Sequence, residues 1–494
     1  MDKNEKREIT LSLNENTSLI ENEFKDSQDI KTSYFTFKNK KAAAIFIETL
    51  INEEKLSKII FERLPGVENT PGEISEVISS STVTTEKNTD KIVDKLLNAY
   101  VVIFSEGSDQ AICFSVAENL SRDMQEPGNE MVIRGAHNGF IEDLNTNIHL
   151  IRKRIANKNL AVKYFKVGKK TNTNIAIVYM NEIANPSLVQ EIEKRIRAIE
   201  SDMIFNPGYM EEFLEDQPSS PFPEMLMTER PDRAMANILD GRVALLTADS
   251  PTALILPSGF FTFYQSPDDY NSRFIAGSFY RMIRMFAFFI AIFFPALYIA
   301  TISYHLEVIP GELIIPIKSS IERIPYPPII EALIMELTIE LIREAGIRLP
   351  SPIGQTIGIV GGLVIGDAVV QAGLVSNITI IVVAGTAVAS FVVPSPEMNT
   401  AVRMLRFPFM FAAASFGYIG ISLCFILMVM NLCKLEPFGS PYFAPLAPLQ
   451  LSGLKDSLIR FPDWKMSKRP KEVHPEQTTS QGPNREWDKN DSGE

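Results

Sequence analysis

The chain has 494 residues, of which 45% are hydrophobic and 22% are charged, and its formal net charge is −12 at pH 7. The charges are unevenly distributed, because residues 285–304 and 407–433 contain none. A single soluble domain is therefore excluded, and the acidic balance without a basic, aromatic-rich stripe argues against nucleic acid as a partner.

Residues 1–30 are highly charged and poor in aromatic residues. Such a segment buries too little apolar surface to fold, so we expect a disordered tail. It also lacks the apolar core of a secretory signal, so the soluble region that follows should stay on the side of the membrane where it is synthesised.

Between residues 31 and 270, short β-rich runs alternate with helical stretches, and their order recurs. The run that begins at Phe37 resembles the run that begins at Phe165, and the closing hairpins at 99–115 and 241–257 also match. We therefore predict an α+β soluble N-terminal region of two tandem α/β subdomains, the first at 31–157 with a linking helix and the second at 158–270.

A cleft between two such subdomains is a common ligand site, but it is equally an ordinary domain interface. His137 and His149 are twelve residues apart with no third ligand nearby, which favours structural histidines over a metal site. The three cysteines are scattered, and the sequence lacks the common phosphate-loop, nucleophile-elbow and zinc-helix motifs. We therefore expect no metal, no cofactor and no enzymatic activity.

The apolar runs of the C-terminal half predict an α-helical polytopic transmembrane domain at 281–435, embedded in a lipid bilayer. The most economical count is four spans, at 283–305, 353–375, 377–394 and 407–432. Basic residues that flank the first and last spans outnumber those on the other side, where we place Arg403 and Arg406, and this favours both termini on the cytoplasmic side. Residues 436–494 form a tail that should be disordered after about residue 470.

Between the first two spans, an apolar segment at 326–345 carries several acidic residues. On a helix these residues share one face, which predicts an amphipathic helix that is interfacial or re-entrant. The acidic face could line an ion vestibule, or it could be an ordinary solvated face. The residues concerned are Glu336, Glu340 and Glu344.

The second span has two chemically different sides. Glycines recur at every fourth position, which lets a neighbouring helix approach closely, at Gly354, Gly358, Gly362 and Gly366. The opposite side gathers Thr356, Val360, Val364, Asp367 and Gln371. A mid-span carboxylate that faces lipid costs at least about 3 kcal/mol, so Asp367 should be buried in protein or should face a water-filled path.

Four helices of one chain cannot both enclose a water-filled path and cover its outside. Such a path therefore requires several copies in a homo-oligomeric ring. In that ring the glycines would contact a neighbouring helix, Val360 and Val364 would form an apolar constriction, and Asp367 would favour cations.

Several long stretches carry a family resemblance. In the soluble half they are 134–140 (Arg-Gly-Ala-His-Asn-Gly-Phe), 146–155, 222–225, 228–232 and 240–246 (Asp-Gly-Arg-Val-Ala-Leu-Leu). In the C-terminal half they are 335–366, 369–376 and 441–448. Over about residues 30–460, the chain resembles the A subunit of spore germinant receptors, the GerA family of endospore-forming bacteria.

The resemblance implies one subunit of a three-component receptor in the inner spore membrane, with a transporter-like B subunit that recognises the germinant and a lipoprotein C subunit. It also implies that A subunits oligomerise into a germinant-gated cation channel that initiates germination. A rival interpretation is a membrane-anchored sensor or scaffold whose soluble cleft binds the germinant while another subunit conducts. A secondary transporter is disfavoured, because one chain shows neither enough spans nor an obvious inverted repeat.

Overall fold

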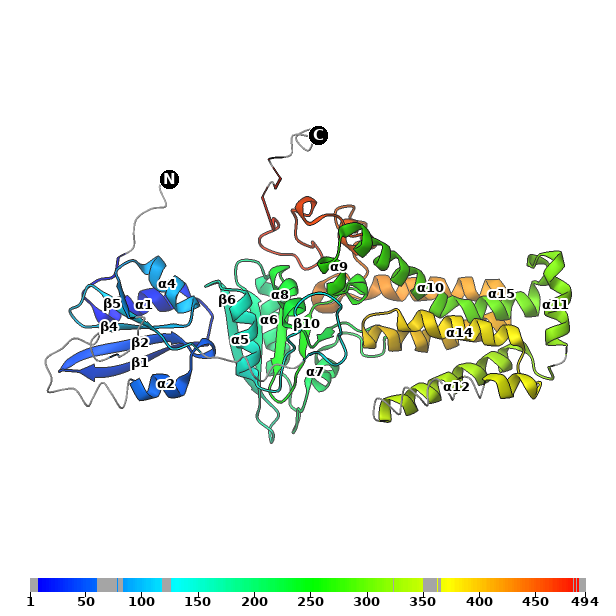
Figure 1. Cartoon of the computed structure of the whole chain (residues 1–494), viewed down its shortest axis with the longest axis horizontal. Helices are drawn as coiled ribbons and strands as arrows, with labels where there is room; N and C mark the ends of the chain where they lie inside the picture. Colours follow the sequence, from blue (N-terminus) through cyan, green and yellow to red (C-terminus); the bar gives the residue numbers. More distant parts are fainter. Residues whose placement is uncertain are drawn as a thin grey trace.

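The structure is a computed structural model that describes residues 8–59, 78, 83–117, 126–322, 324–349, 362, 366–482, 484, 485 and 487. A first α/β unit, a second α/β unit and a helical region follow one another along its longest axis (Figure 1). The expected fold class, an α+β N-terminal region followed by a helical region, is confirmed.

The first unit is built on an antiparallel five-stranded sheet with the strand order β1-β2-β4-β5-β3. Its strands are β1 (Ile30–Phe37), β2 (Lys40–Ile47), β3 (Thr84–Glu86), β4 (Tyr100–Ser105) and β5 (Ala111–Ser115), and its helices are α1 (Leu13–Glu23), η1 (Glu48–Leu50), α2 (Glu53–Ser57) and α4 (Thr89–Leu97). A two-residue turn at Lys38 and Asn39, both with positive φ, joins β1 to β2 and sets their register.

The second unit repeats this topology, with the strand order β6-β7-β9-β10-β8. Its strands are β6 (Leu160–Val167), β7 (Thr173–Met180), β8 (Leu226–Thr228), β9 (Val243–Thr247) and β10 (Ala253–Leu256). Its helices are α5 (Leu144–Arg154), α6 (Pro186–Arg197), α7 (Pro207–Leu214), α8 (Pro231–Leu239) and η4 (Phe260–Tyr264). The matching strand order confirms the tandem duplication that the recurring sequence pattern predicts.

The disordered tail predicted for residues 1–30 is wrong for the described residues, 8–30. Ser12 caps α1 by accepting a hydrogen bond from the backbone N–H of Glu15. Leu13, Ile20 and Phe24 are at most 2% exposed and belong to the core of the first unit. Their helical spacing places them on one face, and the charged residues occupy the other. Composition alone did not predict this, because it ignores spacing.

A buried ion pair holds the two units together. Asp29 is 0% and Arg152 is 1% exposed, and two hydrogen bonds of 2.7 Å join them. Ser27 and Thr49 also donate to the Asp29 carboxylate. His149 lies beside them, with Nδ1 2.8 Å from the carbonyl oxygen of Thr49. The pair fixes the relative position of the units, since either charge alone would be costly to bury.

The helical region contains α9 (Pro267–Asn271), α10 (Phe274–Tyr304), η5 (Leu306–Val308), α11 (Gly311–Ile321), α12 (Pro328–Arg348), α14 (Asn377–Phe391) and α15 (Pro396–Lys434). Helices α10 and α15 are long and apolar enough to cross a membrane, and α14 is a shorter apolar helix. Helix α12 lies where the sequence predicts an amphipathic helix at 326–345. It runs alongside α14, and it also contacts α10 and α15 (Figure 1).

Helix α15 is a hairpin and not a straight rod. Gly417, near its middle, has a φ of 58°, and the ring of Phe293 contacts both Phe409 and Phe425, at centroid distances of 4.8 and 5.6 Å. Residues that are sixteen apart in a straight helix lie about 24 Å apart, so the chain must turn back at Gly417. The predicted single span at 407–432 is therefore corrected to two antiparallel arms, 396–416 and 418–434.

The two ends of the helical region lie next to the α/β units. Arg281 near the start of α10 pairs with Asp456 beyond α15, and Asn431 near the end of α15 donates to a serine of the second unit. At the far end of the bundle, Tyr304 donates to the carbonyl of Ala414, just before the turn of the hairpin. The chain therefore leaves the α/β units along α10 and returns to them along the second arm of α15.

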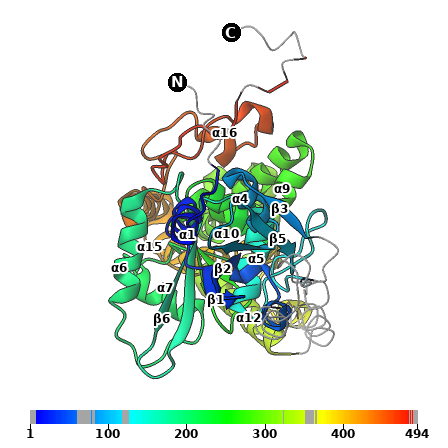
Figure 2. The same ribbon diagram turned by 90° about the vertical axis from the view of Figure 1, so that its left-hand side faces the viewer.

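The C-terminal segment continues with η6 (Pro437–Gly439), α16 (Leu454–Ser457) and η7 (Asp463–Lys465). The disorder expected after about residue 470 is wrong for the described residues up to 482. Arg242 pairs with Glu472 at 3.3 Å, Val473 is 2% exposed, and Lys468 forms a β-bridge with Thr479. Tyr270 of α9 donates to the Asp456 carboxylate of α16 at 2.9 Å, so this part of the segment lies against α9 (Figure 2). Composition did not predict this order, because the few residues that attach the segment, such as Glu472 and Val473, lie in an otherwise polar stretch.

Candidate functional site

A line of charged residues runs between α12, α14 and α15. At one end of this line, Glu336 on α12 pairs with Arg406 on α15, and their side chains are 0% and 2% exposed. Further along α12, Glu340 pairs with Arg403, and Arg343 donates to Ser390 of α14 at 3.0 Å. We call this group the charged seam, and its members are Glu336, Glu340, Arg343, Arg403 and Arg406.

A helix defect ties the charged seam to α10. Pro295 has no backbone N–H, so the carbonyl of Ala291 lacks its usual helical donor. Arg406 supplies a donor, with Nε 2.9 Å from the Ala291 oxygen. Arg406 therefore serves a backbone acceptor on α10 and a buried carboxylate on α12, and it joins three helices.

The three acids that could line a vestibule are separated by the structure. Glu336 is buried against Arg406, Glu340 pairs with Arg403 at 25% exposure, and Glu344 is exposed in an ion pair with Arg348. A shared open acidic face is therefore not present in this conformation. Arg403 and Arg406, which the sequence analysis placed among the flanking charges, instead neutralise the first two acids from within the bundle.

Most of the two-sided second span lies outside the described residues, namely Gly354, Thr356, Gly358, Val360 and Val364. Of the others, Gly362 and Gly366 have no atom within 4 Å of the position where a Cβ would stand. Asp367 and Gln371 are exposed on the helical stretch 366–371, and Gln371 Nε2 donates to Asp367 Oδ2 at 2.6 Å. The described part of one chain thus covers neither these two glycines nor this polar pair.

A second charge network joins α9, α10 and the C-terminal segment. Asp269 is 0% exposed, and its Oδ2 lies 2.7 Å from Arg284 and 3.4 Å from Arg281. Arg281 also pairs with Asp456 at 2.9 Å, and Arg460 donates to the Asp269 carbonyl. These ion pairs and hydrogen bonds therefore tie α10 to α9 and to the C-terminal segment.

Acidic side chains gather where the second unit meets the start of α15. Burial raises the pKa of Glu211 to about 8, and the charges of Glu215, Glu397 and Glu224 add to this effect. Burial also raises the pKa of Glu215 to about 7, with further contributions from Glu224 and Glu212. This junction therefore changes its charge near neutral pH.

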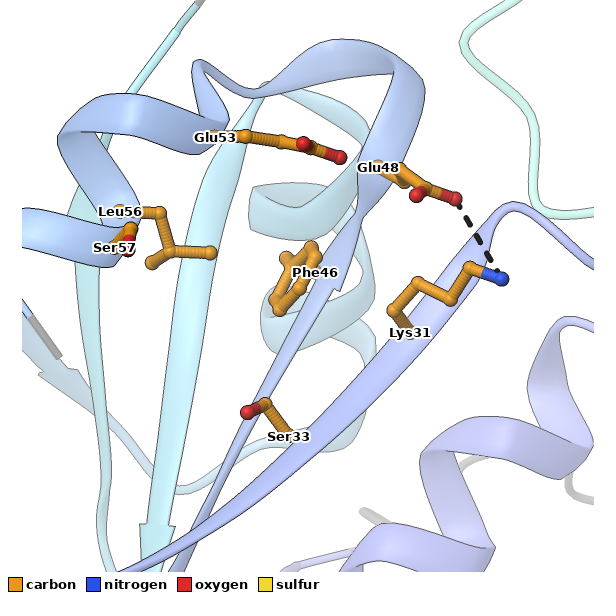
Figure 3. Close-up of a pocket in the computed structure, with 7 residues that line it drawn as sticks. All are labelled: Lys31, Ser33, Phe46, Glu48, Glu53, Leu56 and Ser57. Atoms are coloured by element: carbon orange, nitrogen blue, oxygen red, sulfur yellow. Dashed lines mark ion pairs between the residues drawn. The ribbon is translucent and has the colours of Figure 1, made fainter. Parts of the chain in front are cut away.

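Two surface depressions formed by described residues lie in the first and the second α/β unit, respectively. The first has a volume of about 180 Å³ and is lined by β1, β2 and α2 (Figure 3). Lys31 and Glu48 lie 3.6 Å apart at its edge, and burial, opposed by Lys31 and supported by Glu53, raises the pKa of Glu48. This volume is smaller than the roughly 300–1,000 Å³ of typical small-molecule sites. The second depression, of about 400 Å³, lies between β6 and α6, so neither occupies the interface between the units.

The described residues include no group of three or more His, Cys, Asp or Glu side chains arranged to hold a metal ion. Cys113 is buried, and this burial raises the pKa of its thiol to about 11. A thiol with so high a pKa is a poor nucleophile. The candidate functional features of the described residues are therefore the charge networks and the exposed pair of Asp367 and Gln371.

Comparison with known proteins identifies the family. The family model described as "Bacillus/Clostridium GerA spore germination protein" matches residues 18–472. The chain belongs to the GerA family. It is 40% identical over 447 residues to Spore germination protein KA of Bacillus subtilis (strain 168). This alignment covers 89% of this chain and 82% of that protein.

The chain is also similar to two further relatives and to one solved structure. The GerA-family chain is 37% identical over 478 residues to Spore germination protein A1 of the same organism, covering 95% of this chain and 97% of that protein. It is also 37% identical to a B. subtilis protein named Uncharacterized membrane protein YfkQ, with coverage of 95% and 93%. The crystal structure of the N-terminal domain of the A subunit of the Bacillus megaterium spore germinant receptor GerK3 aligns with a TM-score of 0.41 and 27% identity, over 51% of this chain and 98% of that one.

The partners of the acids on α12 are the functional residues that sequence reasoning missed. A signal was present, because Glu336 and Glu340 are four residues apart and Arg403 and Arg406 are three apart. Each pair shares a helical face, and the charges of the two pairs are complementary. The sequence alone does not show that the acidic face of α12 contacts the basic face of α15, because residues 349–395 separate the two helices.

Proposed function

We propose that this GerA-family chain is the A subunit of a nutrient-responsive germinant receptor in the inner spore membrane. Several copies would form a ring around a cation-conducting path, which opens when germinant binds to the receptor. The observation that supports this proposal most is the exposure of Asp367 and Gln371 on the surface of the helical region.

The location of the pair makes exposure to lipid unfavourable. Val369, between Asp367 and Gln371, packs with Val375 and Val383 toward α12 and α14, so the polar pair faces outward. A carboxylate that faces acyl chains is strongly disfavoured, whereas a water-filled path between copies would solvate it. The open space at Gly362 and Gly366 would accept a helix of a neighbouring copy.

The rest of the proposed receptor follows from the family. A transporter-like B subunit would recognise the germinant and a lipoprotein C subunit would complete the complex. Both α/β units and the C-terminal segment would lie on one side of the membrane, because α10 begins and α15 ends next to the second unit. The basic residues that flank the first and last spans favour the cytoplasmic, spore-core side. We assign germinant recognition to this B subunit because the family resemblance implies it.

Ion flux through reconstituted receptor tests the channel. The A subunit would be inserted into liposomes with its B and C partners, and potassium or sodium efflux would be followed after germinant addition. Asp367→Asn should lower the cation-to-anion permeability ratio, and Val360→Ala or Val364→Ala should raise the basal leak by widening the apolar constriction. Asp202→Asn, at an exposed aspartate of the second unit, is the matched control and should change nothing.

Two results would contradict the proposal. Unchanged flux and selectivity in all three variants would remove the pore assignment. Saturable germinant binding to the A subunit alone, with conduction by another subunit, would favour the sensor interpretation instead.

A further inference from the structure

An oxygen-rich group lies inside the helical bundle, apart from the proposed pore face. Glu331 in the first turn of α12 is 0% exposed. Its Oε2 accepts hydrogen bonds from the backbone N–H of Ser376 at 2.8 Å and from the hydroxyl of Thr379 at 3.1 Å. The Tyr298 hydroxyl of α10 lies 2.9 Å from Thr379 Oγ1 and 3.3 Å from Ser376 Oγ. We call these four residues the Glu331 site.

The Glu331 carboxylate has no charge partner among the described residues. Its Oε1 is buried and lacks any hydrogen-bond partner, and no described lysine or arginine forms an ion pair with it. Glu336, little more than one turn further along α12, contrasts with it because Arg406 neutralises it. A buried carboxylate without a counter-charge is strongly unfavourable and calls for a bound cation or proton.

A structural role accounts for only part of this arrangement. Ser376 is the N-cap of α14, so Oε2 serves as an additional acceptor at that helix terminus. Capping uses one oxygen and leaves Oε1 unexplained. The hydroxyl groups of Tyr298, Ser376 and Thr379 have three hydrogens to donate. They make four oxygen–oxygen contacts, three with one another and one with Glu331 Oε2, so one contact lacks a hydrogen. A proton on Oε2 would supply the fourth hydrogen but would still leave Oε1 without a donor.

We propose that the Glu331 site binds one alkali-metal cation through the carboxylate and the three hydroxyl oxygens. A single carboxylate balances a single positive charge, and all four ligands are hard oxygens. Calcium and magnesium sites usually employ more carboxylates or retain several waters, so a monovalent ion fits better. The cation would contact Oε1. It would also attract the oxygen lone pairs that face each other where a contact lacks a hydrogen.

The surroundings favour tight enclosure of the ion. Ala332 and Val375, which adjoin two of the ligands in the sequence, are each 1% exposed. Tyr298 lies within the uncharged stretch 285–304 of α10. The ligands come from α10, α12 and α14, so an ion bound here stabilises the arrangement of these three helices. Cation occupancy is thereby coupled to any motion that separates them, and this coupling does not depend on the proposed channel.

Equilibrium binding to the full-length chain in lipid nanodiscs tests the site without any flux measurement. Radioactive sodium and rubidium ions, the latter in place of potassium, would be used in a scintillation proximity assay with choline chloride holding the ionic strength. We expect saturable binding of one ion per chain, competed by sodium or potassium. Glu331→Gln should weaken binding about tenfold or more, and Thr379→Val should also weaken it, whereas Thr379→Ser should retain it.

A matched control and three contrary outcomes make the test decisive. Glu344→Gln removes an exposed acid of the same helix and should leave binding unchanged. The proposal is overturned by the absence of saturable binding, or by a site that responds to pH but not to sodium or potassium, which would indicate a proton only. It is also overturned if binding persists in Glu331→Gln and disappears in Asp367→Asn, because the ion would then belong to the pore face. Thr379→Val keeps the proposal testable if Glu331→Gln does not fold.

Discussion

Arg406 Nε lies 2.9 Å from the carbonyl oxygen of Ala291, the acceptor that Pro295 leaves without a helical donor. The same guanidinium neutralises Glu336 of α12. A proline in a long apolar helix usually causes a kink or an unsatisfied carbonyl, and here a side chain from another helix compensates for it. The centre of the bundle is therefore held by one residue with two buried partners.

Arg406→Gln should destabilise the helical region by about 3–5 kcal/mol, because it leaves the Glu336 charge unpaired and buried. The measurement is thermal or denaturant unfolding of the purified protein in detergent. In a Pro295→Ala background the loss should be smaller by about 1 kcal/mol, since that substitution restores a backbone N–H that can serve the Ala291 carbonyl. Arg348→Gln, which breaks an exposed ion pair, is the control and should cost less than about 1 kcal/mol. Equal losses in both arginine variants would contradict the assigned role of Arg406.

Gly417→Ala should destabilise the hairpin of α15. Gly417 has a φ of 58°, and a Cβ at this position would stand 2.9 Å from Nε2 of His305. Residues other than glycine rarely adopt this backbone conformation. We therefore expect the free energy of unfolding to fall by about 1–3 kcal/mol, through backbone strain and displacement of the neighbouring side chains. Expression level and the melting temperature in detergent report the effect. Gly346→Ala, in the interior of α12 with no atom within 4 Å of a Cβ, should be neutral or slightly stabilising.

The acidic junction at Glu211 should make the protein less stable as the pH rises. The pKa of Glu211 is raised to about 8 from an ordinary value of 4.5, so the folded state holds a proton that the unfolded state has lost between these pH values. Stability from this group is therefore lost progressively across that window. Glu211→Gln should raise the melting temperature near pH 8 and have little effect near pH 5. Glu200→Gln, at an exposed glutamate of the same unit, is the control, and an equal pH dependence in both variants would show that Glu211 is not the responsible group.

The ion pair between the α/β units should give an opposite pH dependence. Burial opposes ionisation of Asp29, but Arg152 and the hydrogen bonds of Ser27 and Thr49 prevail and hold the pKa of Asp29 below its ordinary value of 3.8. Its contribution is present above that value and is lost as the pH falls through the lower, folded-state pKa. Asp29→Asn should therefore destabilise the protein strongly at neutral pH, and the gap to wild type should narrow in acid. Asp26→Asn, an exposed site with positive φ that Asn tolerates, should behave like wild type. A gap that is independent of pH would argue against an ionised Asp29.

Much of the architecture is accessible from the sequence. Alternation and turn residues predict the hairpins, and the similarity between the runs at Phe37 and Phe165 predicts two units with the same strand order. Charge-free runs predict the helices α10 and α15, and the family resemblance rests on contiguous stretches that need no structure. These features are local, because the spacing of side chains along a strand or helix already determines which face is apolar.

Other features depend on which segments meet. The hairpin in α15 requires Gly417 at a turn that a continuous apolar run conceals. Helix α1 becomes ordered because the first unit offers Leu13 and Ile20 a core, although its composition favours disorder.

The sequence by itself determined that this protein has a duplicated α/β region, a charge-poor helical half and membership of the GerA family. Only the tertiary structure decided that Glu336 and Arg406 are partners, that Glu331 has none among the described residues, and that the acids of α12 do not share an open face. The reason is physical: the free energy of a buried charge depends on which groups surround it in space, and those groups come from helices that are far apart in the sequence.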